Sequence, residues 1–449
     1  MTEPQLKTDV LILGGGLAGL STAYHLNKLN SLSSIIIEKE SMTGGTAGSI
    51  THEGFTFDFT GHLLHLHSPY GKKLITSFLR GNFRQIKRNS WIYSKNVFTR
   101  YPFQANTYGL PEKVIDDCVL GYLKTIHFPK KKLRPSSQQS FRNWALDSFG
   151  AGICHHFLFP YNEKLWQRPL SEMTTDWQGR FVPAPKPSEV LYGALMDQTT
   201  SFGYNASFIY PKHGGIQALP NAFVKRLKPK QVYLKSPLKS VDLKEKTAIV
   251  DGIGKISFTH LVNTIPLADF LSLCRPLPKN VLEAEKKLSY NSVYCLNLGV
   301  SGPINPKRHW IYFPEKKFPF YRVGFYDQFS RDNAPKKSSS LYIEFSRNSK
   351  ESVNLNFLEK SALQALRRCK ILSSKNKIVA KLWTPIHCAY VVYDFNRAAA
   401  LKTIFSYLEK KSVSSIGRYG AWKYSFMEEA ILDGKSCAEK LLKGASIDA

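Results

Sequence analysis

The chain has 449 residues, of which 43% are hydrophobic, so we expect two or three domains with well-filled cores. It contains 62 Lys and Arg against 34 Asp and Glu, and the resulting net charge of +28 favours anionic partners. Because no apolar run reaches about 18 residues, we expect no transmembrane segment. The first residues are not typical of a signal peptide, so we expect a cytoplasmic protein.

The basic residues and the cysteines argue against two common kinds of site. The basic residues are scattered, and the densest run, at 130–134, is typical of a solvated loop without an RNA-binding or zinc-finger motif. We therefore expect no specific nucleic-acid partner, and either a lysine-rich proteome or peripheral membrane contact explains the charge. The seven Cys are widely spaced and form no CxxC pair, which supports neither a disulfide framework nor a metal site.

Residues 9–38 follow the order strand, glycine turn, helix, strand and acid, which is typical of a dinucleotide site. In this pattern Gly14 permits the tight turn, and Gly16 lets the backbone approach a pyrophosphate at the helix N-terminus. Gly19 lets the helix pack closely on the strand, and Glu38 can accept a hydrogen bond from a ribose hydroxyl. A glycine turn without a ligand is the alternative. The sequence predicts a Rossmann-type nucleotide-binding domain of the α/β class.

A second glycine pair, which includes Gly45, follows soon after the acid. Such a pair suits a flavin nucleotide better than NAD, because glycines admit the close passage of an extended cofactor. Farther on, His62, His65 and His67 lie at strand or loop spacing without a carboxylate or Cys partner, so we expect no metal site. His62 is instead expected beside a flavin ring.

The rest of the chain changes from helices to strands and ends on a helix. Helices are expected at 70–80, 111–125, 140–149 and 153–159, with a hairpin over 91–98. This block has the size of an inserted, mainly helical cap. The strands expected after it lie at 231–234, 248–251, 255–258, 261–265, 293–298, 310–313, 321–326, 341–345 and 380–383. A helix at 354–368, a strand and turn at 415–420 and a last helix at 427–442 complete the chain.

Five segments after residue 59 combine aromatic residues with proline, amides and arginine. They are Thr-Gly-His at 60–62, Tyr-Pro-Phe-Gln-Ala-Asn at 101–106, Pro-Tyr-Asn-Glu-Lys-Leu-Trp at 160–166, Trp-Ile-Tyr-Phe-Pro-Glu at 310–315 with Phe-Tyr-Arg at 320–322, and Gly-Arg-Tyr-Gly-Ala-Trp-Lys-Tyr at 417–424. Together they resemble the UDP-galactopyranose mutases, particularly the eukaryotic-type branch, within the amine-oxidase-like and protoporphyrinogen-oxidase-like FAD flavoproteins. The resemblance extends over nearly the whole chain.

The resemblance implies a three-part fold. Its parts are expected to be a Rossmann-type FAD-binding domain at 1–69, 204–265 and 410–449, a mainly helical cap domain at 70–203, and an antiparallel β-sheet substrate domain at 266–409.

The resemblance also implies an FAD-dependent interconversion of UDP-galactopyranose and UDP-galactofuranose, which belongs to cell-surface polysaccharide biosynthesis. In that family, N5 of the reduced flavin attacks the anomeric carbon, UDP leaves, and the sugar recloses as the furanose from a flavin–sugar adduct. The FAD must be reduced, so NAD(P)H or another reductant acts at least once. The expected partners are a UDP-sugar and further copies of the chain in a homo-oligomer.

The resemblance assigns arginines and tyrosines to the substrate diphosphate. An arginine offers a fixed fork of donors that suits a diphosphate leaving group. Arg180 and Arg322 take this role and, with His62, are the expected catalytic residues. The hydroxyls expected on the same phosphates belong to Tyr312, Tyr390 and Tyr424. A surface or ion-paired arginine is the alternative for Arg322, and Tyr393 is the alternative for Tyr390.

The resemblance places other residues against the uracil and the flavin. The expected uracil contacts are the rings of Tyr101 and Trp166 and the amides of Gln104 and Asn162. Aromatic residues in such segments are equally often part of the core. Arg418 is expected at the flavin, together with the last helix from Met427, whose N-terminus can stabilise negative charge on a reduced ring.

Three other functions stay open. A related mutase can act on another nucleotide sugar, since the segments after His62 and after Tyr424 depart from the family pattern. The main rival of a different class is an FAD-dependent oxidase or desaturase of the amine-oxidase or protoporphyrinogen-oxidase type. A non-catalytic flavin-binding protein is the third.

Overall fold

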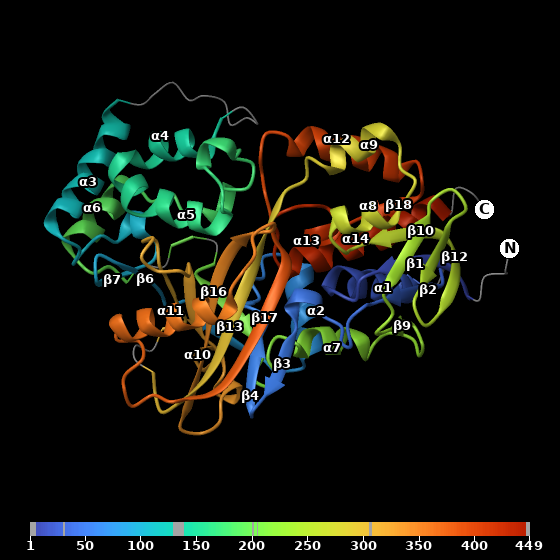
Figure 1. Cartoon of the computed structure of the whole chain (residues 1–449), viewed down its shortest axis with the longest axis horizontal. Coiled ribbons are helices and arrows are strands. Elements are labelled where there is room, and N and C mark those ends of the chain that lie inside the picture. The colour runs from blue at the N-terminus through green and yellow to red at the C-terminus, as the bar shows by residue number, and fades with distance from the viewer. Residues whose placement is uncertain are drawn as a thin grey trace.

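The computed structural model describes residues 6–29, 32–128, 139–199, 202–203, 205–304 and 308–445, apart from the side chains at 180, 444 and 445. These residues form two large and two small sheets with surrounding helices (Figure 1). In Figure 1 the first large sheet lies at the right, the second lies at the lower left, and a group of helices lies above the second. This mixed architecture confirms the predicted α/β fold class.

The first large sheet contains the strands on either side of the glycine turn. Its strands are β1 (Leu6–Leu13), β2 (Ser34–Ile37), β9 (Val232–Tyr233), β10 (Leu238–Asp242), β11 (Thr247–Val250), β12 (Gly254–Asn263) and β18 (Val413–Ser415). The order is β10-β11-β12-β1-β2-β9, with β18 paired to β12, and only the pairs made by β11 are antiparallel. Val10, Leu11 and Ile12 are fully buried, as expected for a parallel sheet covered on both faces.

Helices from three parts of the chain cover this sheet. They are α1 (Leu17–Leu29), α2 (Pro69–Leu79), α7 (Ala218–Val224), α8 (Leu267–Leu273), α9 (Lys279–Glu285), α12 (Arg397–Glu409), α13 (Gly417–Gly420) and α14 (Met427–Ala445). α1 and α14 pack against each other, and α8 and α12 contact β10 and β18. The strand and turn expected at 415–420 is wrong in part, because the chain continues from β18 into the short helix α13.

The second large sheet is mostly antiparallel. Its strands are β6 (Ser90–Ser94), β7 (Val97–Arg100), β13 (Tyr290–Ser301), β14 (Trp310–Tyr312), β15 (Arg322–Phe325), β16 (Ser338–Asn348) and β17 (Ile378–Val391). The order is β17-β13-β16-β15-β14-β6-β7, and only β14 and β6 pair in parallel. The hairpin β6–β7 comes from the range expected for the cap, yet it extends this sheet through β14. The division into three domains by residue range stays a prediction.

The cap helices lie above the second sheet at the upper left of Figure 1. They are α3 (Glu112–His127), α4 (Phe141–Ile153), a π-helix (η3, Cys154–Leu158), α5 (Phe159–Trp166) and α6 (Pro187–Leu195). Ser140 is the N-cap of α4, since its hydroxyl accepts a hydrogen bond from the Asn143 amide. The apolar faces of these helices share one buried cluster, which holds Phe141, Phe149 and Trp166.

Short elements connect these layers. They are the small sheets β3 (Ser49–His52) with β4 (Phe55–Asp58) and β5 (Arg84–Lys87) with β8 (Ser207–Tyr210), the helices α10 (Tyr326–Phe329) and α11 (Leu355–Arg368), and the single turns η1 (Gly45–Ala47), η2 (Phe103–Ala105), η4 (Leu170–Glu172), η5 (Gly179–Phe181) and η6 (Arg331–Asn333). Among the described residues, no helix is long and apolar enough to cross a membrane. The same residues contain no group of three His, Cys, Asp or Glu that could hold a metal ion.

Asp58 at the end of β4 is a fully buried carboxyl group. It accepts hydrogen bonds from Ser49 Oγ at 2.6 Å, from the Tyr210 hydroxyl at 2.9 Å and from the Ile216 amide at 3.2 Å. Burial raises the pKa of Asp58 to about 7 despite these donors. The network anchors the backbone just before the Thr-Gly-His segment at 60–62.

The raised pKa of Asp58 predicts a pH-dependent stability. Its contribution is fully present below the unfolded pKa of 3.8 and is lost as the pH rises through the folded pKa of about 7. A shift of this size corresponds to about 4 kcal/mol of unfolding free energy. We expect Asp58→Asn to remove this slope, so that the melting temperature of the parent falls relative to that of the variant as the pH rises from 5 to 8. Parallel melting profiles of the two proteins would contradict the assignment.

Candidate flavin and substrate site

The glycine turn forms an open cradle at the N-terminus of α1. Gly14 has a φ of +99°, and a Cβ there would lie 2.5 Å from Thr264 Oγ1, so only glycine fits this turn. A Cβ at Gly16 would meet nothing within 4 Å, which leaves open space beside the first turn of the helix. Gly45 follows the αL residue Gly44 and approaches the Cα atom of Gly16. The cradle therefore has room for a phosphate group beside free helical N–H groups.

Glu38 closes this cradle at the end of β2. Its Oε2 atom accepts a hydrogen bond from the Gly15 amide at 2.7 Å, and its Oε1 atom accepts one from the Glu40 amide at 2.9 Å. The carboxylate is buried, and burial raises its pKa. These bonds hold the acid against the glycine turn, where a ribose hydroxyl can use the remaining lone pairs.

The C-terminal part of the chain meets the cradle from the other side. Arg418 on α13 donates to the Ser425 carbonyl at 2.6 Å and to the Ala389 carbonyl at 3.0 Å. Its guanidinium also lies over the rings of Tyr390 and Tyr424, at 5.2 and 4.9 Å from their centroids. Met427 is buried at the start of α14 and belongs to the same core cluster as Leu17 on α1. The predicted flavin-side residues therefore lie on elements packed around the cradle.

His62 is buried within reach of the charges of two guanidinium groups, those of Arg418 and Arg322. Its Nδ1 atom is 3.1 Å from Thr60 Oγ1. Burial, together with the charges of Arg418 and Arg322, lowers the pKa of His62 to about 4. The imidazole is therefore neutral at pH 7. The preceding residue must be glycine, because a Cβ at Gly61 would lie 2.1 Å from the Tyr342 hydroxyl.

Arg322 is held in one orientation by a buried carboxylate. It starts β15, lies opposite Glu344 of β16, and donates through Nε to Oε2 and through Nη2 to Oε1 at 2.8 Å. Glu344 is fully buried, whereas the side chain of Arg322 is partly exposed. Burial opposes the charge of Arg322, but Glu344 raises the pKa of the guanidinium well above its usual value. Within the described ranges Arg322 makes no further hydrogen bond, so Nη1 is available to a ligand.

Tyrosines surround this guanidinium. Tyr312 is the register partner of Arg322, and its ring lies 5.1 Å from that of Tyr101 and 5.3 Å from that of Tyr161. Tyr424 completes the group from the C-terminal side. Burial raises the pKa of Tyr101, Tyr312 and Tyr424, although all three side chains keep accessible surface. Side chains that are largely buried and still keep some accessible surface are typical of the lining of a recess, and we use this word for the space bordered by Arg322, Tyr101, Tyr312 and Tyr424. The raised pKa values keep the phenols protonated.

The expected uracil residues come from η2 and α5. Gln104 is buried, donates to the Pro183 carbonyl at 2.8 Å, and has an Oε1 atom without a partner in the part of the chain that the structure describes. Asn162 donates to the carbonyl of Leu158, the last residue of η3, at 2.8 Å. The ring of Trp166 lies 5.7 Å from that of Tyr390 and 6.0 Å from that of Tyr424. An unpartnered buried acceptor such as Gln104 Oε1 calls for a donor from a ligand or water.

Tyr390 and Tyr393 differ in their surroundings. Tyr390 stacks on Tyr424 at 5.8 Å and faces Arg418, so its ring borders the recess. The Tyr393 hydroxyl instead accepts a hydrogen bond from the Tyr424 amide at 2.7 Å, and its ring is covered by Arg397. Tyr393 therefore has a structural bond that Tyr390 lacks. The side chain of Arg180 lies outside the described residues, and its backbone belongs to η5.

Three residues of this region were not predicted from the sequence. Glu344 orients Arg322, Tyr161 packs against Tyr312, and Lys164 connects α5 to the β14–β15 turn. Lys164 Nζ donates to the carbonyls of Phe313 at 2.7 Å, Glu315 at 2.6 Å and Phe320 at 3.3 Å. Burial lowers the pKa of Lys164 to about 7. Tyr161 and Lys164 lie inside the Pro-Tyr-Asn-Glu-Lys-Leu-Trp segment, and Glu344 is a charged residue within the apolar strand β16. Each of the three could therefore have been singled out from the sequence.

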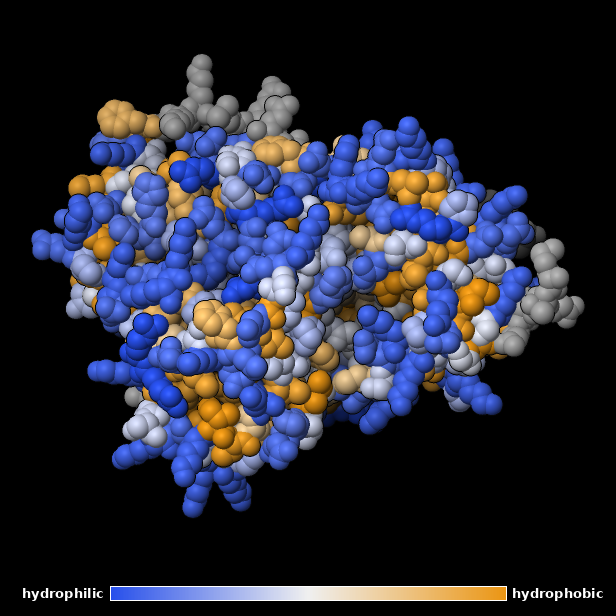
Figure 2. Space-filling model, viewed as in Figure 1, coloured by the Kyte–Doolittle hydropathy of each residue, from blue (hydrophilic) through white to orange (hydrophobic). Residues whose placement is uncertain are grey.

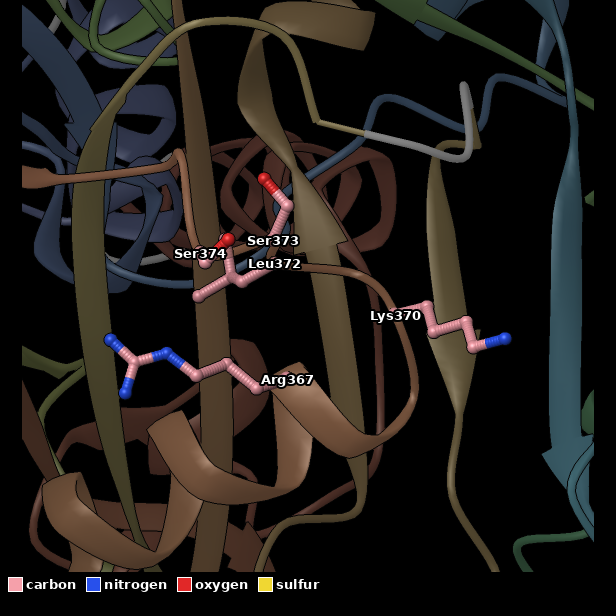
Figure 3. A pocket seen from close by; sticks show the side chains of 5 residues that line it. All are labelled: Arg367, Lys370, Leu372, Ser373 and Ser374. Carbon is pink, nitrogen blue, oxygen red and sulfur yellow. The ribbon is translucent and has the colours of Figure 1, made fainter.

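A surface hollow at the end of α11 lies apart from this recess. It has a volume of about 690 Å³ and is lined by Arg367, Lys370, Leu372, Ser373 and Ser374. Figure 3 shows Arg367 and Lys370 pointing away from each other, so the two cations do not converge on one ligand. We therefore place the candidate site at the recess between the glycine cradle and Arg322.

The comparisons with known proteins identify a flavoprotein. The family model described as flavin containing amine oxidoreductase matches residues 17–442. A crystal structure of reduced UDP-galactopyranose mutase superposes with a TM-score of 0.91 at 25% identity and covers 97% of this chain and 96% of that chain. Wild-type putrescine oxidase bound to putrescine superposes with a TM-score of 0.64 at 18% identity over 98% of this chain and 99% of that chain, which shows the shared fold.

One curated relative carries a different name. A probable flavin-containing monoamine oxidase A of Dictyostelium discoideum is 22% identical over 299 residues, or 64% of this chain. The match spans 63% of that relative's length. The open cradle at Gly16, the buried acid and the free N–H groups of α1 fit the FAD that this family uses. The chain is therefore a flavoenzyme that belongs to the flavin-containing amine oxidoreductase family, with FAD as its cofactor.

Proposed function

We propose that this flavoenzyme interconverts UDP-galactopyranose and UDP-galactofuranose, or the corresponding forms of a related nucleotide sugar. The observation that carries the proposal is the cationic, forked Arg322 in a recess lined by tyrosine hydroxyls. Arg322 and Arg418 both bring positive charge to the recess, which favours an anionic substrate and repels a protonated amine. The similarity of the fold to a UDP-galactopyranose mutase supports the same reading.

The chain's own residues have distinct parts in this proposal. Arg322 donates from Nη1 to the diphosphate, and the guanidinium stays in place because Glu344 binds its Nε and Nη2 atoms. The hydroxyls of Tyr312, Tyr390 and Tyr424 are further donors to the same phosphates. Tyr312 and Tyr424 keep their phenol protons, because burial raises the pKa of both hydroxyls. Arg180 is proposed as the second diphosphate arginine.

The opposite end of the recess recognises the base. Gln104 Oε1 is a buried acceptor that suits the N3–H of uracil, and the rings of Tyr101 and Trp166 are its proposed walls. Asn162 is the second amide. This arrangement holds the uridine part of the substrate away from the flavin, so that the sugar is the part that reaches it.

The FAD supplies, in its reduced form, the nucleophile for the anomeric carbon. The residues proposed to hold it are Gly14, Gly16, Gly19, Glu38 and Gly45 at the nucleotide end, and His62, Arg418 and Met427 at the ring. His62 is uncharged at pH 7 and can therefore donate or accept a hydrogen bond without adding positive charge. NAD(P)H or another reductant is proposed to reduce the FAD, because the isomerisation of the sugar supplies no electrons. We also propose that the protein is a homo-oligomer and that it is located in the cytoplasm.

Conversion of UDP-galactofuranose to UDP-galactopyranose, followed by chromatography, tests this proposal directly. The FAD-loaded protein is incubated with the furanose before and after reduction with dithionite. We expect conversion only after reduction, without consumption of further reductant. An amine oxidase, which the name of the curated relative suggests, would instead release peroxide from an amine with the oxidised protein. Peroxide release without any conversion or UDP binding would overturn the proposal.

A further inference from the structure

Glu428 on the first turn of α14 is a buried carboxylate, only 3% exposed. Figure 2 shows a surface on which hydrophilic residues prevail, so a charged side chain in the interior stands out. Two other buried carboxylates, Asp327 and Glu344, pair with arginines. Within the part of the chain that the structure describes, Glu428 forms no ion pair. A buried carboxylate without a cation is costly to the fold, so its hydrogen bonds must compensate.

The bonds of Glu428 go to the N-terminus of another helix. Its Oε1 atom accepts from the His67 amide at 3.1 Å and from the Ser68 amide at 3.0 Å, and its Oε2 atom accepts from the His67 amide at 2.9 Å. All three bonds use the carboxylate as an acceptor, which suits its ionised form. Ser68 is the N-cap of α2. The positive ends of two helix dipoles, those of α2 and α14, therefore meet at one carboxylate.

The charge of Glu428 is more than helix capping requires. Ser68 already caps α2, since its hydroxyl accepts a hydrogen bond from the Gly71 amide at 3.3 Å. A Cβ at Gly71 would lie 2.5 Å from Glu428 Oε1, so only glycine leaves room for the carboxylate. Glycine within a helix is destabilising. The chain thus keeps a buried charge and a helical glycine where neutral side chains would suffice for the fold, and we infer that the charge has a second role.

Glu428 connects the two segments that are proposed to hold the flavin ring. It directly follows Met427, the proposed ring residue at the start of α14. The segment from His62 to α2 is fixed in its middle by backbone bonds of 3.1 and 2.9 Å between Leu64 and Ile209. Glu428 fixes the far end of that segment. In Figure 1, α2 lies below α13 and α14 at the middle of the molecule. The carboxylate therefore holds the His62 segment and α14 in one arrangement.

We propose that Glu428 is a positioning residue for the FAD ring and that its charge lowers the reduction potential of the FAD. Reduction of a flavin near pH 7 takes up two electrons and one proton, so the ring gains one negative charge. A fixed carboxylate next to Met427 opposes this charge and offsets the positive end of the α14 dipole. The reduced ring is then more electron-rich. The value of this for a nucleophilic ring rests on the proposed function, whereas the effect on the potential needs only bound FAD.

The midpoint potential of the FAD-loaded protein, titrated with dithionite beside a reference dye, tests this role. Glu428→Gln removes the charge and keeps the length and one acceptor. We expect it to favour reduced over oxidised FAD about tenfold, which raises the midpoint by about 30 mV for a two-electron couple. Its FAD content should stay near that of the parent. Glu428→Ala removes the acceptor as well, so it should raise the midpoint and also weaken FAD binding severalfold.

Glu429→Gln is the matched control. Glu429 lies on the same turn of α14 but is partly exposed, so solvent screens its charge and the midpoint should move much less. A midpoint of Glu428→Gln that equals the parent's or is more negative overturns the proposal. An equal rise in Glu429→Gln overturns it as well, because any charge on this turn would then have the same effect.

A second variant covers the case in which Glu428→Gln does not hold FAD. Glu428→Ala, which leaves room for water at the same amides, then decides by the same measurement. Failure of both variants to fold or to hold FAD assigns the carboxylate to the fold alone and overturns the proposal. None of these measurements uses a nucleotide sugar. A parent protein that converts no sugar would therefore overturn the proposed function and leave this inference standing.

Discussion

Substitution of Arg322 by alanine is expected to weaken UDP binding by about a hundredfold or more, because truncating one partner of a desolvated, charge-assisted contact costs several kcal/mol. The FAD content is expected to stay near normal, since Arg322 lies on β15 of the second sheet and the glycine cradle lies on the first. The measurement is a titration of the reduced protein with UDP, followed by the flavin spectrum.

The matched control for this experiment is Arg322→Lys. Alanine leaves Glu344 buried without a partner, which by itself destabilises the fold by about 3–5 kcal/mol. Lysine keeps a positive charge opposite Glu344 but lacks the planar fork, so it should restore the melting temperature more than the affinity for UDP. Loss of FAD together with UDP in both variants would mean that Arg322 supports the cofactor instead of the diphosphate.

Substitution of Lys164 by methionine is expected to lower both the stability of the protein and its affinity for UDP. The ammonium group donates to three carbonyls, of Phe313, Glu315 and Phe320, on both sides of the β14–β15 turn. Methionine has a similar length but no donor, so these acceptors lose their partner, which costs about 3 kcal/mol or more of unfolding free energy. The UDP affinity falls because Lys164 holds α5, with Asn162, against the strands that carry Tyr312 and Arg322.

Lys164→Arg is the control for this prediction, since arginine stays charged and can donate to several carbonyls. Thermal melting and UDP titration of both variants, compared with the parent protein, separate the two effects. We expect the arginine variant to recover most of the stability and part of the affinity. A methionine variant with the melting temperature and UDP affinity of the parent would show that the lysine does not connect the two halves of the recess.

Features that depend on the local conformation of the backbone were predictable from the sequence. The positive φ of Gly14 is a property of the turn itself, and the apolar run of β1 specifies a buried parallel strand. The Ser140 cap of α4 is local in the same way. Such features are determined by sterics and hydrogen bonds within a few residues, so the pattern of residue types already contains them.

The recess itself depends on strand pairing and on contacts between distant segments. Arg322 meets Glu344 only because β15 and β16 pair in that register, and Lys164 meets the β14–β15 turn only because the cap docks on the second sheet. The sequence could not separate Tyr390 from Tyr393 either, since the difference is a hydrogen bond from the Tyr424 amide.

The sequence by itself thus determined the flavin cradle and the residue types offered to a substrate, because backbone conformation and residue chemistry are local. Only the tertiary structure decided which arginine is oriented by a buried carboxylate, which tyrosine faces the recess, and that Glu428 of α14 meets the N-terminus of α2. Burial and partner choice are properties of packing between segments far apart in the chain. They follow from the whole arrangement of sheets and helices, which no single segment specifies.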